Sequence, residues 1–322
     1  MNSTHRFSVF VAAALVFSGV SVQGADVPGL TTIRIVDAGQ DVDAEAFYAQ
    51  DLGIFKKYGI NADITLLRKG GGAASVEAVT GGAADIGEGD IVSAANAHQR
   101  GLPIVLLAPS GIFRASEPTT EVIVAKDSPI KSGKDLEGKS IALISPEGPS
   151  RIATNLWLEN AGAALDRVSF IELPPVNMAA AVEHGTVAAA VINEPALVAS
   201  QSCCRVLANL FTSVGNTWQL NAWYATPDWV AKNPALAHKF AQAIREAAIW
   251  ANNPANHAKS GEILSKYTPF PPELLPKMNR ATYGETLDPK TMAPLLNAAL
   301  KYKAIQAAVP SGQLISSAAI SP

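Results

Sequence analysis

The chain has 322 residues, of which 48% are hydrophobic and 16% are charged. This length and composition suffice for the hydrophobic core of one large domain or two modest ones. The formal net charge is −3, and a nucleic-acid-binding protein needs a basic face, so the charge balance argues against a nucleic-acid partner.

The first 24 residues are typical of an export signal. His5 and Arg6 precede an apolar run at positions 7–22, and the small residues Gly24 and Ala25 follow it. The run is shorter than the roughly 20 residues that span a bilayer as a helix, and the small residues offer a cleavage site. We expect cleavage after Gly24 and a soluble periplasmic protein, with an uncleaved membrane anchor as the alternative.

Strand and helix patterns alternate through the first part of the mature chain. Strands are predicted at residues 33–36, 63–67, 85–87 and 104–108, and helices at 44–57, 73–80 and 91–99. Repeated strand–helix–strand units imply right-handed crossovers onto a mostly parallel sheet.

The same alternation starts again after an extended segment at residues 121–125. Strands are predicted at 140–144, 168–173 and 188–192, and helices at 149–161 and 178–184. Residues 220–224 are again extended, and the chain after them is helical, at 234–250, 255–266, 272–278 and 289–302. The sequence after Val309 has weak patterning, and we expect part of it to be disordered.

Three sequence blocks, in this order, carry a family resemblance. Residues 49–90 run from AQDLGIFKKYGI to ADIGEGD, residues 122–143 read VIVAKDSPIKSGKDLEGKSIAL, and residues 178–195 read MAAAVEHGTVAAAVINEP. They resemble the solute-binding proteins of ABC importers, in the NMT1/THI5-like branch that takes up sulfonates, nitrate, taurine and thiamine-precursor-like compounds.

The resemblance implies an α/β fold of the type II periplasmic-binding-protein class, with two lobes that are each a mostly parallel sheet flanked by helices. The first lobe would combine residues 31–120 with 220–302, the second would be 126–217, and 303–322 would be a C-terminal tail. Two crossings, near 120–125 and 218–224, would form a hinge. The implied function is to capture a small organic or oxyanionic solute between the lobes and to deliver it, as a monomer, to a membrane permease.

The sequence offers no case for catalysis, a cofactor or a metal. It lacks the G-x-S-x-G, H-E-x-x-H and Walker A motifs, and its histidines have no paired ligand spacing. Asp85, Glu88 and Asp90 lie close together, but a hard cation needs six or more oxygens, and carboxylates commonly cap strand and helix ends.

Two alternatives stay open. A fungal branch of this fold makes the thiamine pyrimidine enzymatically, but it carries a cysteine-rich motif and has no signal peptide. The other alternative is a protein that binds a thiamine-pyrimidine precursor.

The cysteines, Cys203 and Cys204, are neighbours in the chain. Adjacent Cα atoms are about 3.8 Å apart, below the usual disulfide range of about 4.4–6.8 Å, so a bond between the two would strain the backbone. We expect free thiols, and a vicinal disulfide is the alternative. Neither suggests catalysis.

Candidate ligand residues of the first lobe follow predicted strands or begin a helix. The glycines at 70–72 allow a sharp turn, and the free N–H groups of the following helix end favour an anion. The alternative is a plain loop-to-helix junction. The candidates here are Gln40, Asp41, Gly72, Ala73, Ala74, Ser75, Gly89 and Asp90.

The second lobe contributes Ser150 and Arg151 in a strand-to-helix loop, and Asn193 and Glu194 at the end of a strand. Arg151 could grip a carboxylate or sulfonate through two parallel hydrogen bonds, or it could pair with Glu147.

Trp218, near a crossing, could supply a stacking surface, and a place in the hydrophobic core is the alternative. We expect an acidic ligand. The carboxylates of Asp41, Glu88, Asp90 and Glu194 leave a cationic or amino ligand as the alternative.

Overall fold

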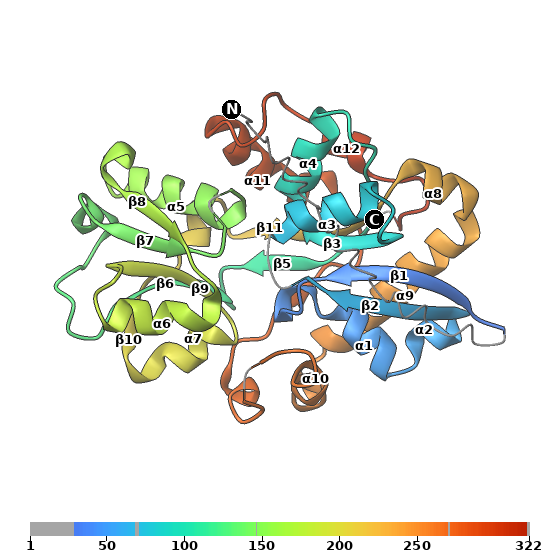
Figure 1. The fold of residues 1–322 in the computed structure, drawn as a ribbon, viewed down its shortest axis with the longest axis horizontal. Helices are drawn as coiled ribbons and strands as arrows, with labels where there is room; N and C mark the ends of the chain where they lie inside the picture. Colours follow the sequence, from blue (N-terminus) through green and yellow to red (C-terminus); the bar gives the residue numbers. More distant parts are fainter. Residues whose placement is uncertain (1–28, 68–70, 146, 270, 321–322) are drawn as a thin grey trace, which may run out of the picture.

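The computed structural model describes residues 29–67, 71–145, 147–269 and 271–320, and it contains two α/β lobes that lie side by side (Figure 1). Each lobe is built on a five-stranded sheet, and a smaller three-stranded sheet lies between the lobes.

The sheet of the first lobe has the order β2-β1-β3-β12-β4. β1 is parallel to β2 and β3, whereas β12 is antiparallel to β3 and β4. The strands are β1 (Thr31–Asp37), β2 (Ile60–Leu66), β3 (Ile86–Asp90), β4 (Val105–Pro109) and β12 (Asn221–Ala225). Because β12 enters this sheet only after the chain has formed the second lobe, the first lobe combines two separate stretches of chain.

Helices cover both faces of this sheet because its strands are apolar on both sides. Along β12, Tyr224 packs in one core cluster with Val79 and Ile91, whereas Trp223 packs in the other with Phe47 and Phe240. The helices around this sheet are α1 (Glu45–Asp51), α2 (Ile54–Lys57), α3 (Gly71–Thr80), α4 (Ile91–Gln99), α8 (Pro227–Lys232), α9 (Pro234–Asn252), α10 (His257–Leu264), α11 (Pro289–Lys301) and α12 (Ser311–Leu314).

The sheet of the second lobe has the order β10-β6-β9-β7-β8. β7 is parallel to β8 and β9, and β6 runs antiparallel to β9 and β10. The strands are β6 (Thr120–Ala125), β7 (Ser140–Leu143), β8 (Ser169–Glu172), β9 (Ala189–Asn193) and β10 (Cys204–Ala208), and the helices are α5 (Pro149–Asn160), α6 (Pro175–Glu183) and α7 (Ala196–Ala199).

A three-stranded sheet joins the lobes. β5 (Gly111–Arg114) follows β4 and pairs with β11 (Thr217–Gln219), which leads back to β12, and with β13 (Thr282–Tyr283). The crossing predicted at 120–125 is therefore wrong, because those residues form β6 inside the second sheet and the chain crosses earlier, in β5. Sequence analysis missed β13 altogether, since two residues carry no periodicity.

Three other sequence predictions differ from the structure. The helix predicted at 44–57 breaks at Gly53, whose φ of 73° is left-handed, and becomes α1 and α2. The helix predicted at 272–278 is reduced to a 3-10 turn at Leu275–Lys277. The tail is packed rather than disordered over its described residues, because Leu314 is buried and Ile315 forms a bridge with Leu106 in β4.

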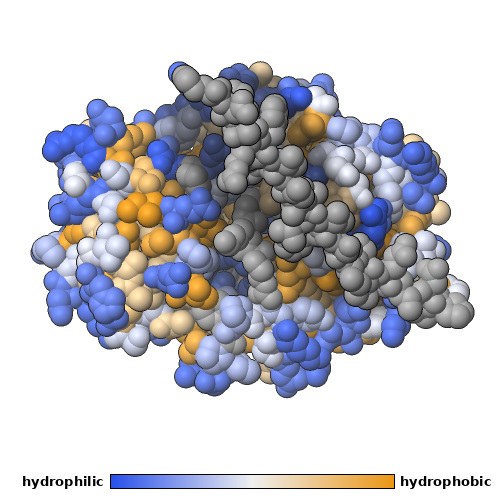
Figure 2. Space-filling model, viewed as in Figure 1, coloured by the Kyte–Doolittle hydropathy of each residue, from blue (hydrophilic) through white to orange (hydrophobic). Residues whose placement is uncertain are grey.

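The surface mixes polar and apolar residues. Figure 2 shows an apolar group on the second lobe, over the part that holds β7 and β8. Ile171 of the edge strand β8 is among the exposed large hydrophobic residues. No helix in the described part of the chain is long and apolar enough to cross a membrane.

Candidate functional site

The carboxyl ends of β1 and β9, one strand from each lobe, meet at a side-chain contact. The amide of Asn193, the last residue of β9, donates a hydrogen bond to Oε1 of Gln40, in the loop after β1. Open α/β sheets bind ligands at the carboxyl ends of their strands. The structure therefore brings together two predicted site residues from opposite lobes. Asn193 is 7% exposed, and its Oδ1 has no hydrogen-bond partner among the described residues.

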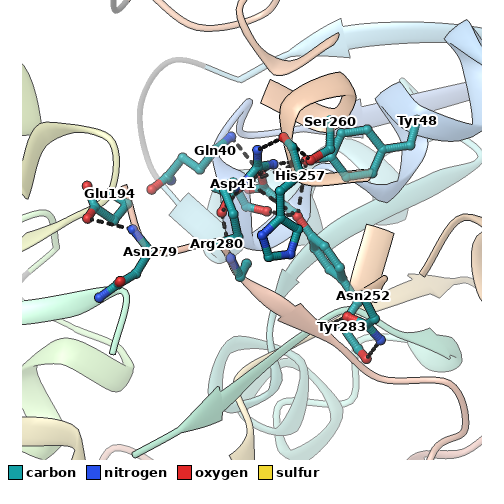
Figure 3. Close-up of polar contacts among 12 residues, drawn as sticks. Gln40, Asp41, Tyr48, Glu194, Asn252, His257, Ser260, Asn279, Arg280 and Tyr283 are labelled. Atoms are coloured by element: carbon teal, nitrogen blue, oxygen red, sulfur yellow. Dashed lines mark hydrogen bonds and ion pairs between the residues drawn. The ribbon is translucent and has the colours of Figure 1, made fainter. Parts of the chain in front are cut away.

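Asp41 forms a buried ion pair with Arg280 (Figure 3). Its Oδ1 accepts a hydrogen bond from Nη2 of Arg280 at 2.7 Å, and its Oδ2 accepts one from the backbone N–H of Ala281 at 2.6 Å. The same guanidinium donates to the Tyr48 hydroxyl at 2.6 Å. The Asp41 and Arg280 side chains are 1% and 8% exposed. Both oxygens of Asp41 are thus used within the first lobe, and its contact with a ligand stays a prediction.

Glu194 lies beside Asn279, apart from the Asp41–Arg280 pair (Figure 3). Its carboxylate accepts hydrogen bonds from the backbone N–H groups of Val198, at 3.0 Å, and Asn279, at 3.3 Å. The Asn279 side chain donates to the carbonyl of Pro118 at 2.8 Å. Burial raises the pKa of Glu194 to about 7. Asn279 thus contacts the second lobe while its neighbour Arg280 contacts the first.

Helix α3 begins at Gly71, inside the glycine triplet predicted to form a turn. Position 70 of the predicted triplet lies outside the described residues. A Cβ at Gly72 would meet Oδ2 of Asp90 at 2.5 Å, so the glycine is required by packing within the lobe. Of the predicted helix-end residues, Ala73 is exposed, Ala74 is half-buried and Ser75 is buried. The Ser75 side chain therefore belongs to the interior.

Asp90 caps helix α4. Its carboxylate accepts hydrogen bonds from the backbone N–H of Ser93, at 2.9 Å, and from the Ser93 hydroxyl, at 2.7 Å. A Cβ at Gly89 would lie 2.7 Å from the Tyr224 hydroxyl and 2.9 Å from Cα of Gly72. Gly89 and Asp90 therefore each have a structural role, and their contact with a ligand stays a prediction.

Arg151 lies in the first turn of α5, and its guanidinium stacks over the ring of Phe170 with 3.4 Å to the ring centroid. The described residues contain no ion pair to it, so the alternative pairing with Glu147 is not formed. Stacking on an aromatic face leaves the N–H groups at the guanidinium edge able to donate. The preceding Ser150 offers its carbonyl to the Thr154 hydroxyl at 2.6 Å.

Trp218 is part of the core of the connecting sheet. Its ring centroid lies 5.3 Å from that of Phe113 and 5.0 Å from that of Phe211, and its Nε1 donates to the Phe211 carbonyl at 3.3 Å. It is fully buried. These contacts favour the core as the place of Trp218, and its stacking on a ligand stays a prediction.

Four buried carboxyl groups lie together at this end of the first lobe, and of these only Glu88 was named from the sequence. They are Asp37, Asp43, Glu45 and Glu88, which are at most 3% exposed. Asp37 and Glu88 follow the paired residues Val36 and Gly87, so they are neighbours across β1 and β3. Burial raises the pKa of all four, and their mutual repulsion raises it further. We call this set the carboxyl cluster.

The carboxyl cluster is partly hydrogen-bonded. Asp37 accepts from the backbone N–H of Gly39 at 2.7 Å, and Glu45 accepts from the Ser110 hydroxyl at 3.0 Å. Asp37 Oδ2, Glu45 Oε1 and Glu88 Oε1 have no partner among the described residues. No group of three histidine, cysteine or acidic residues in the described ranges has an arrangement that could hold a metal ion. The raised pKa values favour protonated carboxyl groups in this cluster, and protonation relieves their mutual repulsion.

Comparisons with known proteins agree with this architecture. The chain is 27% identical over 172 residues to the nitrate/nitrite binding protein NrtA of Synechococcus elongatus, covering 49% of this chain but only 38% of that relative. The solved aliphatic sulphonate binding protein SsuA of Escherichia coli superposes with a TM-score of 0.71 at 19% identity, over 88% of this chain and 92% of the other. The nitrate-binding protein NrtA of Synechocystis PCC 6803 gives a TM-score of 0.71 at 16% identity, over 91% and 88% of the two chains.

The structural matches establish that the fold is that of the periplasmic binding proteins, as the sequence blocks predicted. The profile of the NMT1/THI5-like family matches residues 42–257, which include most of both lobes. The chain therefore belongs to the NMT1/THI5-like family.

Proposed function

We propose that this protein is the exported solute-binding component of an ABC importer, which captures a small solute between its two lobes and delivers it to a membrane permease. The observation that carries the proposal is the contact between Gln40 and Asn193, which joins the carboxyl ends of one strand from each lobe. The named functions of the nitrate- and sulphonate-binding relatives support it.

The proposed cycle is a population shift between separated and closed lobes. A ligand that contacts both lobes only in the closed arrangement stabilises that arrangement with its binding free energy. Every strand of the connecting sheet is short, from two to four residues. Such a connection can bend while each five-stranded sheet keeps its own core, and the permease can then distinguish loaded from empty receptor.

For the ligand we propose a small oxyanion or organic acid, held by Arg151 from the second lobe. Its guanidinium is fixed in orientation by Phe170 and has no ion-pair partner in the described chain. A charged hydrogen bond contributes about 1.5–3 kcal/mol. Micromolar affinity needs about 8 kcal/mol, so amide contacts from Gln40 and Asn193 and apolar burial have to supply the remainder.

A second candidate is an amino or aminopyrimidine ligand, as expected for a thiamine-precursor receptor. Glu194 favours it, since this carboxyl group lies next to Asn193 at the end of β9 and its pKa of about 7 lets it exist in either charge state near neutrality. A cationic ligand would hold Glu194 in its ionised form. Glu194 would then be the charged partner of the ligand, the role that Arg151 has in the first proposal.

The test is a thermal-shift screen of the secreted protein against nitrate, an alkanesulfonate, an aromatic carboxylate and an aminopyrimidine. The expected result is a melting temperature that rises with the logarithm of ligand concentration for one class, together with a smaller radius of gyration in scattering. Identical scattering profiles at saturation would contradict lobe closure. Recovery of a chemically altered compound would support the enzymatic alternative instead.

A further inference from the structure

The thiols of Cys203 and Cys204 face the same side of the chain. Consecutive residues in a strand point to opposite faces, but Cys203 ends a 3-10 turn (Ser200–Ser202) with φ −115° and ψ −18°, and β10 begins only at Cys204. This bend removes the alternation and brings the two Sγ atoms to 3.1 Å. Closing to the bond length of about 2.0 Å needs a movement of only about 1 Å.

These two cysteines have no other partner for a disulfide within the chain, because the sequence contains just two. A bond between neighbours closes a small strained ring, since the Cα spacing of about 3.8 Å is below the usual range. Strained disulfides have higher reduction potentials and are the labile, reversible ones. A bond here would therefore be a reversible modification rather than a permanent staple.

The two thiols differ in accessibility, which sets the order of reaction. Cys203 is half-buried, whereas Cys204 is 5% exposed. Burial and the adjacent Cys203 raise the pKa of Cys204 to about 12, with Glu183 raising it and Lys126 lowering it. Cys203 is therefore the thiol that a reagent meets first. Cys204 lines a cavity of about 100 Å³, which has room for water to accept its proton.

We propose that Cys203 and Cys204 form a reversible redox-modification site, which a small disulfide or a disulfide-carrying oxidant converts into a vicinal disulfide. The Cys203 thiolate attacks one sulfur of the oxidant, whose S–S bond breaks and releases one thiolate. Cys204 then loses its proton and attacks the Cys203 sulfur of the mixed disulfide, which releases the second thiol. Two protein thiols are oxidised and one oxidant disulfide is reduced to two thiols.

Oxidation changes contacts between β10 and its neighbours. The single S–H of Cys203 lies within donating distance of the carbonyls of Ser200, at 3.4 Å, and Ala179, at 3.8 Å, and the Cys204 thiol can donate to Ala179 at 3.8 Å. The disulfide has no S–H donors, so these links between α6, the 3-10 turn and β10 are lost. The site is independent of the identity of the transported solute.

The test uses the mature protein equilibrated with oxidised glutathione, quenched with acid, alkylated and digested with trypsin. Cleavage after Arg167 and Arg205 places both cysteines in one peptide of residues 168–205. The expected result is loss of both alkylation sites in most molecules, a peptide lighter by two hydrogens, and full recovery of both sites after dithiothreitol. Two alkylated thiols after oxidation, a chain-to-chain dimer, or glutathione remaining on both cysteines would overturn the proposal.

A matched variant tests the order of the steps. In Cys204→Ser the reaction should stop at the mixed disulfide, with one glutathione on Cys203. Cys203→Ser should react with glutathione many-fold more slowly, because the thiol that remains, Cys204, is buried. Equal rates for the two variants would overturn the assigned order. The peptide measurement on the unchanged protein tests disulfide formation even if neither variant folds.

Discussion

The two sides of the candidate site differ in how far their polar groups are already used. On the first lobe, Asp41 is paired with Arg280, Asp90 caps a helix, and the carboxyl cluster is buried. On the second lobe, Arg151 has an aromatic support but no ion pair in the described residues, and Asn193 keeps an unused oxygen. The first lobe therefore resembles a fixed wall, and the second supplies groups that remain free to bind.

This comparison predicts that a change in the first-lobe wall lowers stability more than it lowers ligand affinity. The largest effect should come from Arg280→Met, which leaves the Asp41 carboxylate buried without its partner. Breaking a buried pair from one side costs about 3–5 kcal/mol. The free energy of unfolding in urea measures it.

The matched control for this prediction is Lys259→Met. Lys259 and Glu262 form an ion pair in which both side chains are more than half exposed, so little change is expected. If Arg280→Met unfolds at the same urea concentration as this control, the Asp41–Arg280 pair does not stabilise the first lobe.

The next prediction concerns pH, and it sharpens the comparison because buried carboxyl groups lie on both sides. The pKa of Glu194 is raised by burial from 4.5 to about 7, and burial raises the pKa of Asp37, Asp43, Glu45 and Glu88 as well. A raised folded-state pKa stabilises the protein below the unfolded pKa, and this stabilisation is lost as pH rises through the folded value.

The free energy of unfolding should therefore fall between about pH 5 and pH 8. Glu194 can contribute up to about 3 kcal/mol of this change. Its pKa is raised from 4.5 to about 7, and each pKa unit is worth about 1.4 kcal/mol of stability. Urea unfolding at several pH values should show a shallower fall for Glu194→Gln and for Glu88→Gln. The exposed Glu262→Gln is the control. A stability that rises over this range would contradict the assignment of protonated, buried carboxyl groups.

The third prediction tests the free side. If the ligand is acidic, Arg151→Ala should weaken its binding roughly 10- to 150-fold, because one charged hydrogen bond of about 1.5–3 kcal/mol is lost. Arg167→Ala is the control, since Arg167 is exposed and pairs with Glu137. Isothermal titration with the compound identified in the screen measures both. Normal binding by Arg151→Ala together with lost binding by Glu194→Gln would show that the ligand is amino rather than acidic.

The alternation of strands and helices, and with it the two sheets, could be predicted because periodicity is local. The site was harder to predict. Gln40 and Asn193 were predicted because Gln40 comes after one strand and Asn193 ends another. Arg280 was missed, because it reaches Asp41 across 239 positions of sequence and nothing near it marks a partner.

The carboxyl cluster could have been suspected from its pattern. Asp37 ends an apolar strand, and Glu88 lies inside the short strand IGEGD, which is a place where a charge is costly. Trp218 and Asp90 were assigned to the ligand because sequence shows residue type but not direction. In the structure the indole lies inside the core of the connecting sheet and the carboxylate caps a helix, and both groups have hydrogen-bond partners without a ligand.

The smallest expected effect concerns Asn279, the residue that connects the two sides. Its side chain donates to Pro118 beside the second lobe, while the next residue, Arg280, is held by the first. Asn279→Ala removes the side-chain hydrogen bond and keeps the backbone N–H that Glu194 accepts. The loss is about 0.5–1.5 kcal/mol. If that bond forms only when the lobes are closed, its whole free energy appears in ligand affinity, as a weakening of about 2- to 13-fold. The ligand-free Asn279→Ala variant should then scatter with a larger radius of gyration than the unchanged protein.

The control is Lys277→Ala, an exposed change two residues earlier in the same segment, which should alter neither the ligand affinity nor the radius of gyration. A stability loss of this size with unchanged affinity and radius would mean that Asn279 bonds equally in open and closed arrangements, and that the segment anchors the hinge without favouring either one.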